Sequence, residues 1–162
     1  MLIRRAVPSD ATAIAAIILP TIRESATYAL DPAMSEEEAL AYWLDTGKEV
    51  FVAEAEGAIL GTYYIRPNQG GGGAHVCNCG YMTAAAATGR GVARAMCAHS
   101  LSHARVSGYR AMQYNFVVSS NARAVRLWQA MGFAIVGRLP GAFRHPHHGY
   151  VDALVMYRSL ID

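Results

Sequence analysis

The sequence lacks several features that would place it in common classes of protein. Its apolar runs, such as residues 11–19, are far too short to span a membrane. The 14 Lys and Arg residues are scattered rather than gathered in a basic stripe, which argues against a nucleic-acid partner. The three cysteines are odd in number, and residues 1–5 begin like a strand rather than a signal peptide. We therefore expect a cytoplasmic protein with reduced thiols and no membrane partner.

Enough apolar sequence is present for an ordinary folded core. The chain has 162 residues, of which 53% are hydrophobic and 16% are charged. This balance favours a folded protein over a disordered one. Because no internal repeat and no linker divides the chain, we expect residues 1–162 to form a single domain.

Apolar periodicity and turn residues predict an α/β fold. Strands are expected at residues 2–7, 50–55, 58–66, 74–83, 111–118, 133–138 and 151–158. Helices are expected from about residue 9 to near Pro20, and at residues 35–44, 90–107 and 121–131. Glu56-Gly57 predicts a tight hairpin turn, and Ser35 with Glu38 predicts a helix-capping box. The residues between the last two strands, which include three histidines, are expected to form a loop.

A glycine-containing turn, Thr88–Ala93, follows the fourth expected strand and leads directly into a helix. Gly89 and Gly91 carry no side chains, so several backbone N–H groups can converge on one point. The N-terminus of the helix adds unpaired N–H groups and the positive end of the helix dipole. The turn is therefore a candidate site for an anion such as a pyrophosphate.

Two common phosphate-binding motifs do not match this turn. A Rossmann turn needs a third glycine and a carboxylate after the next strand, and neither stands at Ala95, Met96 or residues 112–118. A P-loop needs a Gly-Lys-Ser/Thr sequence, which is absent here. A dinucleotide-binding domain is therefore a weaker alternative for this chain.

A second motif lies further along, where Asn121–Phe133 reads Asn-Ala-Arg-Ala-Val-Arg-Leu-Trp-Gln-Ala-Met-Gly-Phe. Together and in this order, Thr88–Ala93 and Asn121–Phe133 resemble the two motifs of the GNAT superfamily of acetyl-CoA-dependent N-acetyltransferases. The resemblance covers nearly the whole chain. It implies a mixed, mostly antiparallel central sheet flanked by helices and splayed between its fourth and fifth strands. It also implies acetyl-CoA as the co-substrate.

The resemblance indicates which residues bind the coenzyme. The glycine turn would hold the pyrophosphate, and the backbone of the fourth strand would bind the pantetheine arm. Asn121 would face that arm from the opposite wall, although it is equally expected as the N-cap of its own helix. The expected coenzyme-binding residues are Met82, Thr83, Thr88, Gly89, Arg90, Gly91, Val92, Ala93, Asn121 and Trp128.

The chain departs from the family pattern at two of these positions. Thr88 stands where the family usually has Gln or Arg, so the turn has one side-chain donor fewer. Trp128 stands where many members have a Tyr that is proposed to protonate the departing thiolate, and an indole N–H does not titrate in this range. A thiolate is a tolerable leaving group without that proton, which Tyr150 or water could supply.

The candidate general base is His75, on the fourth expected strand. Histone-acetylating members of the family carry a Glu base on this strand, and the same spacing from the turn leads to His75. An imidazole suits proton abstraction from an ammonium group, whereas a purely structural histidine is the alternative. His75, Cys77 and Cys79 alternate along the strand about 7 Å apart, which is too far for three ligands of one zinc ion. We therefore expect no metal.

The resemblance places the acceptor pocket next to the histidine-containing loop. Arg144, His145 and Tyr150 from this loop, and Glu24, Tyr28 and Tyr64 from the opposite side, are the candidate acceptor-binding residues. Three aromatic rings and one carboxylate would suit a cationic amine or an amino acid. A solvated loop is the simpler interpretation of the histidines themselves.

These observations predict an enzyme that transfers the acetyl group of acetyl-CoA to a primary amine of a small molecule. Direct attack in a ternary complex is expected, because no cysteine is placed as a relay nucleophile. The competing hypothesis is a regulatory module that binds an acyl-CoA without turnover, which Trp128 in place of Tyr would allow. Homodimers are common among proteins that resemble this one, but no specific residue here supports one.

Overall fold

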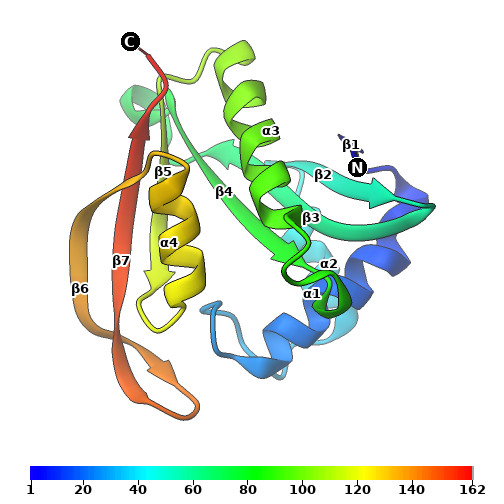
Figure 1. Cartoon of the computed structure of the whole chain (residues 1–162), viewed down its shortest axis with the longest axis horizontal. Coiled ribbons are helices and arrows are strands. Elements are labelled where there is room, and N and C mark those ends of the chain that lie inside the picture. Colours follow the sequence, from blue (N-terminus) through cyan, green and yellow to red (C-terminus); the bar gives the residue numbers. More distant parts are fainter. Residues whose placement is uncertain (162) are drawn as a thin grey trace.

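Seven strands form one twisted sheet in the order β1-β2-β3-β4-β5-β7-β6 in the computed structural model, which describes residues 1–161 (Figure 1). The strands are β1 (Leu2–Arg5), β2 (Glu49–Ala55), β3 (Ala58–Pro67), β4 (Val76–Thr83), β5 (Ala111–Val118), β6 (Ala134–His145) and β7 (Gly149–Ser159). Neighbouring strands are antiparallel except for β4 and β5, which run parallel. The expected mixed, mostly antiparallel sheet is confirmed.

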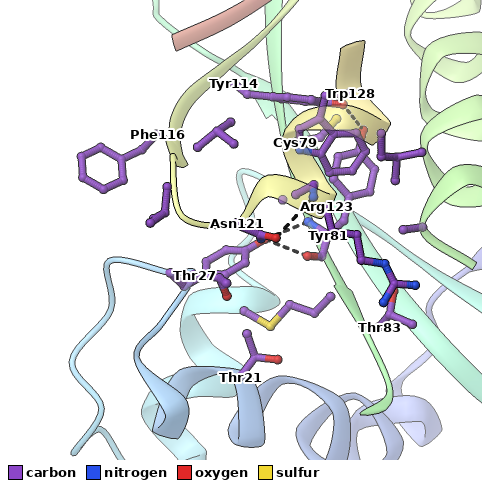
Figure 2. A pocket seen from close by; sticks show the side chains of 18 of the residues that line it. Thr21, Thr27, Cys79, Tyr81, Thr83, Tyr114, Phe116, Asn121, Arg123 and Trp128 are labelled. Atoms are coloured by element: carbon purple, nitrogen blue, oxygen red, sulfur yellow. Dashed lines mark hydrogen bonds between the residues drawn. The ribbon is translucent and has the colours of Figure 1, made fainter. Parts of the chain in front are cut away.

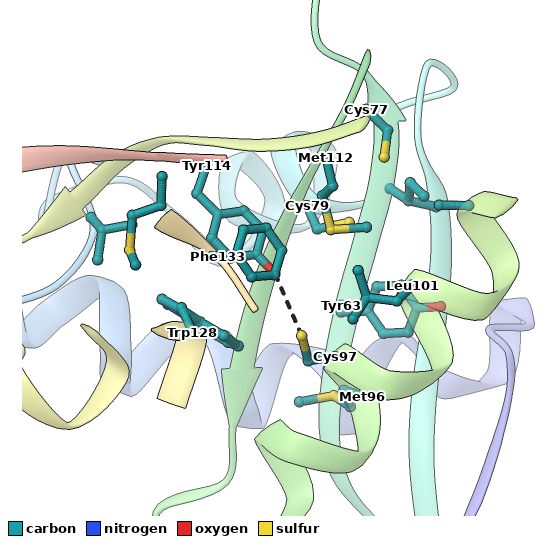
Figure 3. Packing of buried hydrophobic residues seen from close by; sticks show 14 of the residues in the cluster. Tyr63, Cys77, Cys79, Met96, Cys97, Leu101, Met112, Tyr114, Trp128 and Phe133 are labelled. Carbon is teal, nitrogen blue, oxygen red and sulfur yellow. Dashed lines mark hydrogen bonds between the residues drawn. The ribbon is translucent and has the colours of Figure 1, made fainter. Parts of the chain in front are cut away.

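Helices cover both faces of this sheet (Figure 1). They are α1 (Ala11–Glu24), α2 (Glu36–Trp43), α3 (Val92–Val106) and α4 (Ala122–Ala130). One buried cluster joins α3 and α4 to one sheet face (Figure 3), and a second joins α1 and α2 to the other. No helix within residues 1–161 is both long and apolar enough to cross a membrane.

The parallel strands β4 and β5 pair at only two positions and then separate. The paired residues are Val76 with Ala111 and Cys77 with Met112. At the next step the side chain of Asn78 donates a hydrogen bond to the carbonyl oxygen of Gln113 at 2.9 Å, and beyond it the strands diverge. The expected splay is thus confirmed, and it leaves one backbone edge of β4 without a neighbouring strand.

Local signals in the sequence set several element ends correctly. Ser35 Oγ accepts a hydrogen bond from Glu38 N–H, and Glu38 Oε2 accepts one from Ser35 N–H, at 3.0 and 2.7 Å. Glu56 and Gly57 both have positive φ, at 53° and 75°, as a tight hairpin turn between β2 and β3 requires. Both the capping box and the hairpin are therefore confirmed.

The first helix extends past the proline that was expected to end it. Helix α1 continues through Pro20 to Glu24 and stops at Ser25, which adopts the left-handed conformation. Proline removes the hydrogen bond to the carbonyl of Ala16, but both residues are exposed, so water can bond to this carbonyl. The exposed position of Pro20 explains why the helix tolerates it.

The predicted histidine-containing loop is largely a strand pair. Strand β6 reaches His145 and pairs with β7, with Arg144 opposite Tyr150 and an irregularity between Leu139 and Phe143. Pro140 lies in that irregularity on the edge strand, where a missing N–H leaves no ladder bond unmade. Prolines and histidines therefore suggested a loop where cross-strand pairing forms a hairpin.

Candidate active site

A crevice of about 680 Å³ lies where β4 and β5 separate (Figure 2). It extends from the turn before α3, past the open edge of β4, to the side chains of β3 and of the segment between α1 and α2. All of the expected coenzyme-binding residues except Arg90 line it. The structure therefore brings the two sequence motifs to one cavity.

The glycine turn presents a group of backbone donors at one end of the crevice. Gly89 and Gly91 have φ values of 85° and 78°, and Gly91 is the N-cap of α3. Within residues 1–161, the N–H groups of Gly89, Gly91, Val92, Ala93 and Arg94 make no hydrogen bond to a protein acceptor. Such converging donors at a helix N-terminus bind anionic groups such as phosphates.

Two arginines at this end were missed by the sequence analysis. Arg94 and Arg123 both line the crevice, and Arg123 reaches toward Thr83 (Figure 2). An Arg123 guanidinium nitrogen lies 3.5 Å from the position that a Cβ atom on Gly89 would occupy. Arg123 lies inside the Asn121–Phe133 motif, two residues after Asn121, but this spacing alone does not show that it faces the glycine turn.

The Asn121 side chain has the capping role that was one of its two expected functions. Its Oδ1 atom accepts a hydrogen bond from Ala124 N–H at 3.3 Å, while Asn121 also lines the crevice. The cap fixes the start of α4 and therefore the position of Trp128, about two helical turns further along. Both roles are compatible with this geometry.

Trp128 packs in an aromatic group rather than standing free as a donor (Figures 2 and 3). Its ring centroid lies 5.1 Å from those of Tyr81 and Tyr114, and the residue is 8% exposed. Tyr114 contacts Cys97, and burial raises the pKa of both tyrosines well above the ordinary value. These buried phenols stay protonated at neutral pH.

The open edge of β4 is bridged by Tyr28, from the segment after α1. Its hydroxyl accepts a hydrogen bond from Tyr81 N–H at 2.8 Å and donates one to Tyr81 C=O at 3.0 Å. These two backbone groups point away from β3 and into the crevice. Tyr28 was expected among the acceptor-binding residues, and it lines the crevice beside the open edge of β4.

The end of the crevice opposite the glycine turn is lined by tyrosines and one arginine. Tyr28, Tyr42, Tyr64 and Arg66 contribute side chains there. A Cβ on Gly80 would lie 2.6 to 2.8 Å from atoms of the Tyr64 ring, so the glycine makes room for this tyrosine. Within residues 1–161 the lining of the whole crevice includes no Asp, Glu or His.

Neither expected catalytic side chain lies in the crevice. His75 is exposed in the turn before β4, six residues before Tyr81 at the middle of the open strand edge and thus roughly 20 Å away along an extended strand. Tyr150 is 73% exposed at the start of β7 and is also outside the lining. Because a general acid or base must come within hydrogen-bond reach of the reacting atoms, this placement argues against both assignments.

The remaining acceptor candidates, Glu24, Arg144 and His145, are also outside the crevice. Arg144 and His145 line a separate shallow hollow with Ser25, the residue after Glu24. His145 Nδ1 accepts hydrogen bonds from the backbone N–H groups of His147 and His148, at 3.1 and 3.2 Å. The imidazole thus stabilises the tip of the β6–β7 hairpin.

Comparison with known proteins identifies the family. The model of the acetyltransferase (GNAT) family matches residues 17–133, which contain both sequence motifs and the diverging strands. The chain belongs to the GNAT acetyltransferase family. The glycine turn, the open edge of β4 and the Asn121 helix are thus the parts of a GNAT fold.

Individual relatives agree with this membership. A GCN5-related N-acetyltransferase from Kribbella flavida is 41% identical, with a TM-score of 0.93, over 98% of this chain and 96% of that one. The Salmonella typhimurium protein yncA, solved with its cofactor acetyl-CoA, shares the fold at 23% identity and a TM-score of 0.86, over 100% of this chain and 95% of that one.

A curated relative, the N-acetyltransferase aca1 of Schizosaccharomyces pombe, is 32% identical over 99 residues. The match covers 60% of this chain and 47% of the relative. The chain thus matches about half the length of this curated protein.

Proposed function

We propose that this GNAT protein transfers the acetyl group of acetyl-CoA to a primary amine of a small molecule. The observation that carries the proposal is the single crevice that joins the free N–H groups of the glycine turn to the open edge of β4. A ligand with a phosphate group at one end and an amide-containing arm at the other fits this combination. The residues present therefore fit acetyl-CoA.

The turn and the strand edge have separate tasks in this proposal. The N–H groups of Gly89 to Arg94, with Arg94 and Arg123, hold the pyrophosphate end. Tyr81 N–H, on the open edge of β4, is the donor for the thioester carbonyl oxygen and stabilises the negative charge that develops there. The hydroxyl of Tyr28 occupies this donor and must move away from it.

The reaction is direct transfer between two bound substrates. The amine nitrogen forms a bond to the acetyl carbon, the bond from that carbon to sulfur breaks, and the thiolate leaves. The amine loses its proton to water, because no Asp, Glu or His lines the crevice within residues 1–161. Tyr28 and Tyr64, whose pKa values burial raises, are neutral hydrogen-bonding groups in this scheme.

Steady-state kinetics with acetyl-CoA and a panel of amines tests the proposal. We expect free thiol to appear only when both substrates are present, with initial-velocity lines that intersect as a ternary complex requires. Tight acetyl-CoA binding without amine-dependent thiol release would favour the regulatory module. If an Arg123→Ala variant keeps both acetyl-CoA binding and turnover, Arg123 is not part of the proposed site.

We propose that residues 1–162 act as one domain in the cytoplasm. A homodimer is a further prediction, to be checked by measuring the molar mass of the protein in solution.

A further inference from the structure

The acceptor end of the crevice carries a positive charge with no acidic counterpart. Arg66 lines this end from β3, where it is paired with Asn78 of β4. Within residues 1–161, the Arg66 guanidinium makes no ion pair, and its Nε atom is buried without a hydrogen-bond partner. A buried, unpaired donor is costly, so its retention beside a cavity points to a ligand group.

The neighbouring cation, Lys48, differs from Arg66 in being satisfied by the protein. Lys48 Nζ lies 3.6 Å from the ring centroid of Tyr42 and 4.3 Å from that of Tyr64, and it donates to the carbonyl of Tyr42. Burial and the charge of Arg66 lower the pKa of Lys48 to about 8. Lys48 thus has partners within the protein at its charged nitrogen. Arg66 Cζ lies 6.0 Å from the centroid of the Tyr64 ring, but its guanidinium pairs with no carboxylate of residues 1–161.

Arg66 is also at a suitable distance from the reacting position. Its partner Asn78 precedes Tyr81 by three residues, which is roughly 10 Å along the strand. An arginine side chain together with a small amino acid spans that length. The hydroxyls of Tyr42 and Tyr64, 3.5 Å apart, line the same end and add neutral hydrogen-bonding groups.

We propose that the acceptor is a small amino acid whose carboxylate is bound by the guanidinium of Arg66 while its amine faces Tyr81. The proposal rests on the acetyl-transfer function above and names its substrate class. The planar guanidinium presents paired N–H donors that match the two oxygens of a carboxylate. Of the two acceptor classes that the sequence left open, a cationic amine and an amino acid, this proposal selects the amino acid, and it assigns the charged contact to Arg66 rather than Glu24.

The first experiment compares acceptors that differ only in the acidic group. Leucine, leucinamide and isoamylamine share a side chain and a primary amine, and only leucine carries a carboxylate. We expect kcat/KM, calculated on the concentration of unprotonated amine, to be roughly 10- to 100-fold higher for leucine than for the other two, as a charge-assisted pair in a partly buried site gives. Equal values for all three acceptors in the wild-type protein would overturn the proposal.

The second experiment assigns the preference to Arg66. In an Arg66→Gln variant, we expect the preference for leucine over isoamylamine to be lost. Arg66→Lys should keep part of this preference, because lysine retains the positive charge but lacks the paired N–H donors of the guanidinium. An equal loss of activity on all three acceptors in Arg66→Gln would indicate a structural role and contradict the proposal. The dissociation constant for acetyl-CoA controls for folding and should stay unchanged in both variants.

A binding measurement separates this proposal from the proposed function. N-acetylleucine should raise the melting temperature of the wild-type protein more than N-acetylleucinamide does, and Arg66→Gln should abolish the difference. This holds even if no amine is acetylated, which would refute acetyl transfer but leave the carboxylate site standing. If amines are acetylated but the carboxylate changes neither kcat/KM nor the melting temperature, the Arg66 site is refuted and the acetyl-transfer function stands.

Discussion

Among single residues, Tyr28 is the one whose hydroxyl competes with the proposed thioester for a hydrogen bond from Tyr81 N–H. It satisfies both the N–H and the C=O of Tyr81, and the proposed mechanism gives that same N–H to the thioester oxygen. The free protein therefore keeps its oxyanion donor occupied until a ligand displaces the phenol. The two hydrogen bonds between Tyr28 and Tyr81 stabilise the free protein, and coenzyme binding must break the one from Tyr81 N–H.

A Tyr28→Phe variant should thus lose stability and gain coenzyme affinity. We expect the free energy of unfolding to fall by about 1–2 kcal/mol, since two hydrogen bonds are lost. We expect the dissociation constant for acetyl-CoA to fall by about 3- to 10-fold, since no hydroxyl competes for Tyr81 N–H. Urea unfolding and calorimetric titration measure the two quantities.

Tyr42→Phe is the matched control for Tyr28→Phe. It removes a hydroxyl from the same crevice that touches only Tyr64 Oη, at 3.5 Å, and no backbone group of β4. Its acetyl-CoA affinity should equal that of the wild type. An unchanged affinity in Tyr28→Phe as well would mean that the thioester does not use Tyr81 N–H.

At the scale of elements, the turn before α3 depends on the backbone conformation of Gly91. A Cβ atom at this position would meet nothing within 4 Å, so only the φ of 78° opposes a side chain. Gly108, after the other end of α3, has a φ of 85° and equally open surroundings. The two glycines therefore differ only in their distance from the candidate coenzyme site.

Replacing each glycine with alanine should separate stability from binding. Gly91→Ala and Gly108→Ala should each lower the free energy of unfolding by about 1–2 kcal/mol, because left-handed backbone disfavours a Cβ. Only Gly91→Ala should also weaken acetyl-CoA binding, by roughly tenfold, as the turn relaxes and its N–H groups diverge. Equal coenzyme affinities in the two variants would remove the turn from the site.

The start of α1 is attached to β1 by a buried carboxylate. Asp10 accepts hydrogen bonds from Arg4 at 2.8 and 3.0 Å and from Val7 N–H at 2.8 Å. The bonds from Arg4, and then that from Val7, hold the pKa of Asp10 below its ordinary value of 3.8. A lowered pKa means that this carboxylate stabilises the fold above pH 3.8 and loses that effect as the pH falls further.

Asp10→Asn should therefore destabilise the protein in a pH-dependent manner. At pH 7 we expect the free energy of unfolding to fall by about 1–3 kcal/mol, because charged hydrogen bonds to a buried group are lost. The difference from the wild type should shrink as the pH falls below the ordinary pKa of the carboxyl. Urea unfolding curves across that range provide the measurement, and a constant difference would contradict the linkage.

At the scale of the whole molecule, the composition of the crevice sets the pH dependence of the reaction. Within residues 1–161, the titratable lining of the crevice consists of arginines, tyrosines and Cys79, and burial raises the pKa of the Cys79 thiol well above its ordinary value. The tyrosines and this thiol are neutral near pH 7, so the protonation state of the acceptor amine controls the rate. The protonated amine cannot attack. Activity must therefore rise with pH until the amine of the acceptor is deprotonated.

We expect kcat/KM to rise about tenfold per pH unit below the pKa of the acceptor amine. Two acceptors with different amine pKa values should give profiles displaced by that difference, and His75→Ala should leave both unchanged. Rate measurements across the pH range test this. If kcat/KM for both acceptors instead rose around the same pH, the titrating group would be a base on the protein.

Some features of the fold could be predicted from the sequence, and others could not. The element order, the glycine turn and the Ser35 cap follow from local signals, because turn and cap residues act on their own backbone. The divergence of β4 and β5 was implied by the resemblance to the GNAT family. The assignment of His75 rested on spacing along the chain, and that of Tyr150 on the place of its loop in the family that the chain resembles. Spacing says nothing about which end of a strand faces the cavity.

From the amino-acid sequence, two short motifs predicted the family and the fold class, and the residues Thr88–Ala93 predicted the glycine turn before α3. Only the tertiary structure decided the character of the acceptor end. Tyr28, Tyr64 and Arg66 come together because β3 pairs with β4 and the segment after α1 crosses the open strand edge. These are long-range contacts, and no local pattern of residues specifies them.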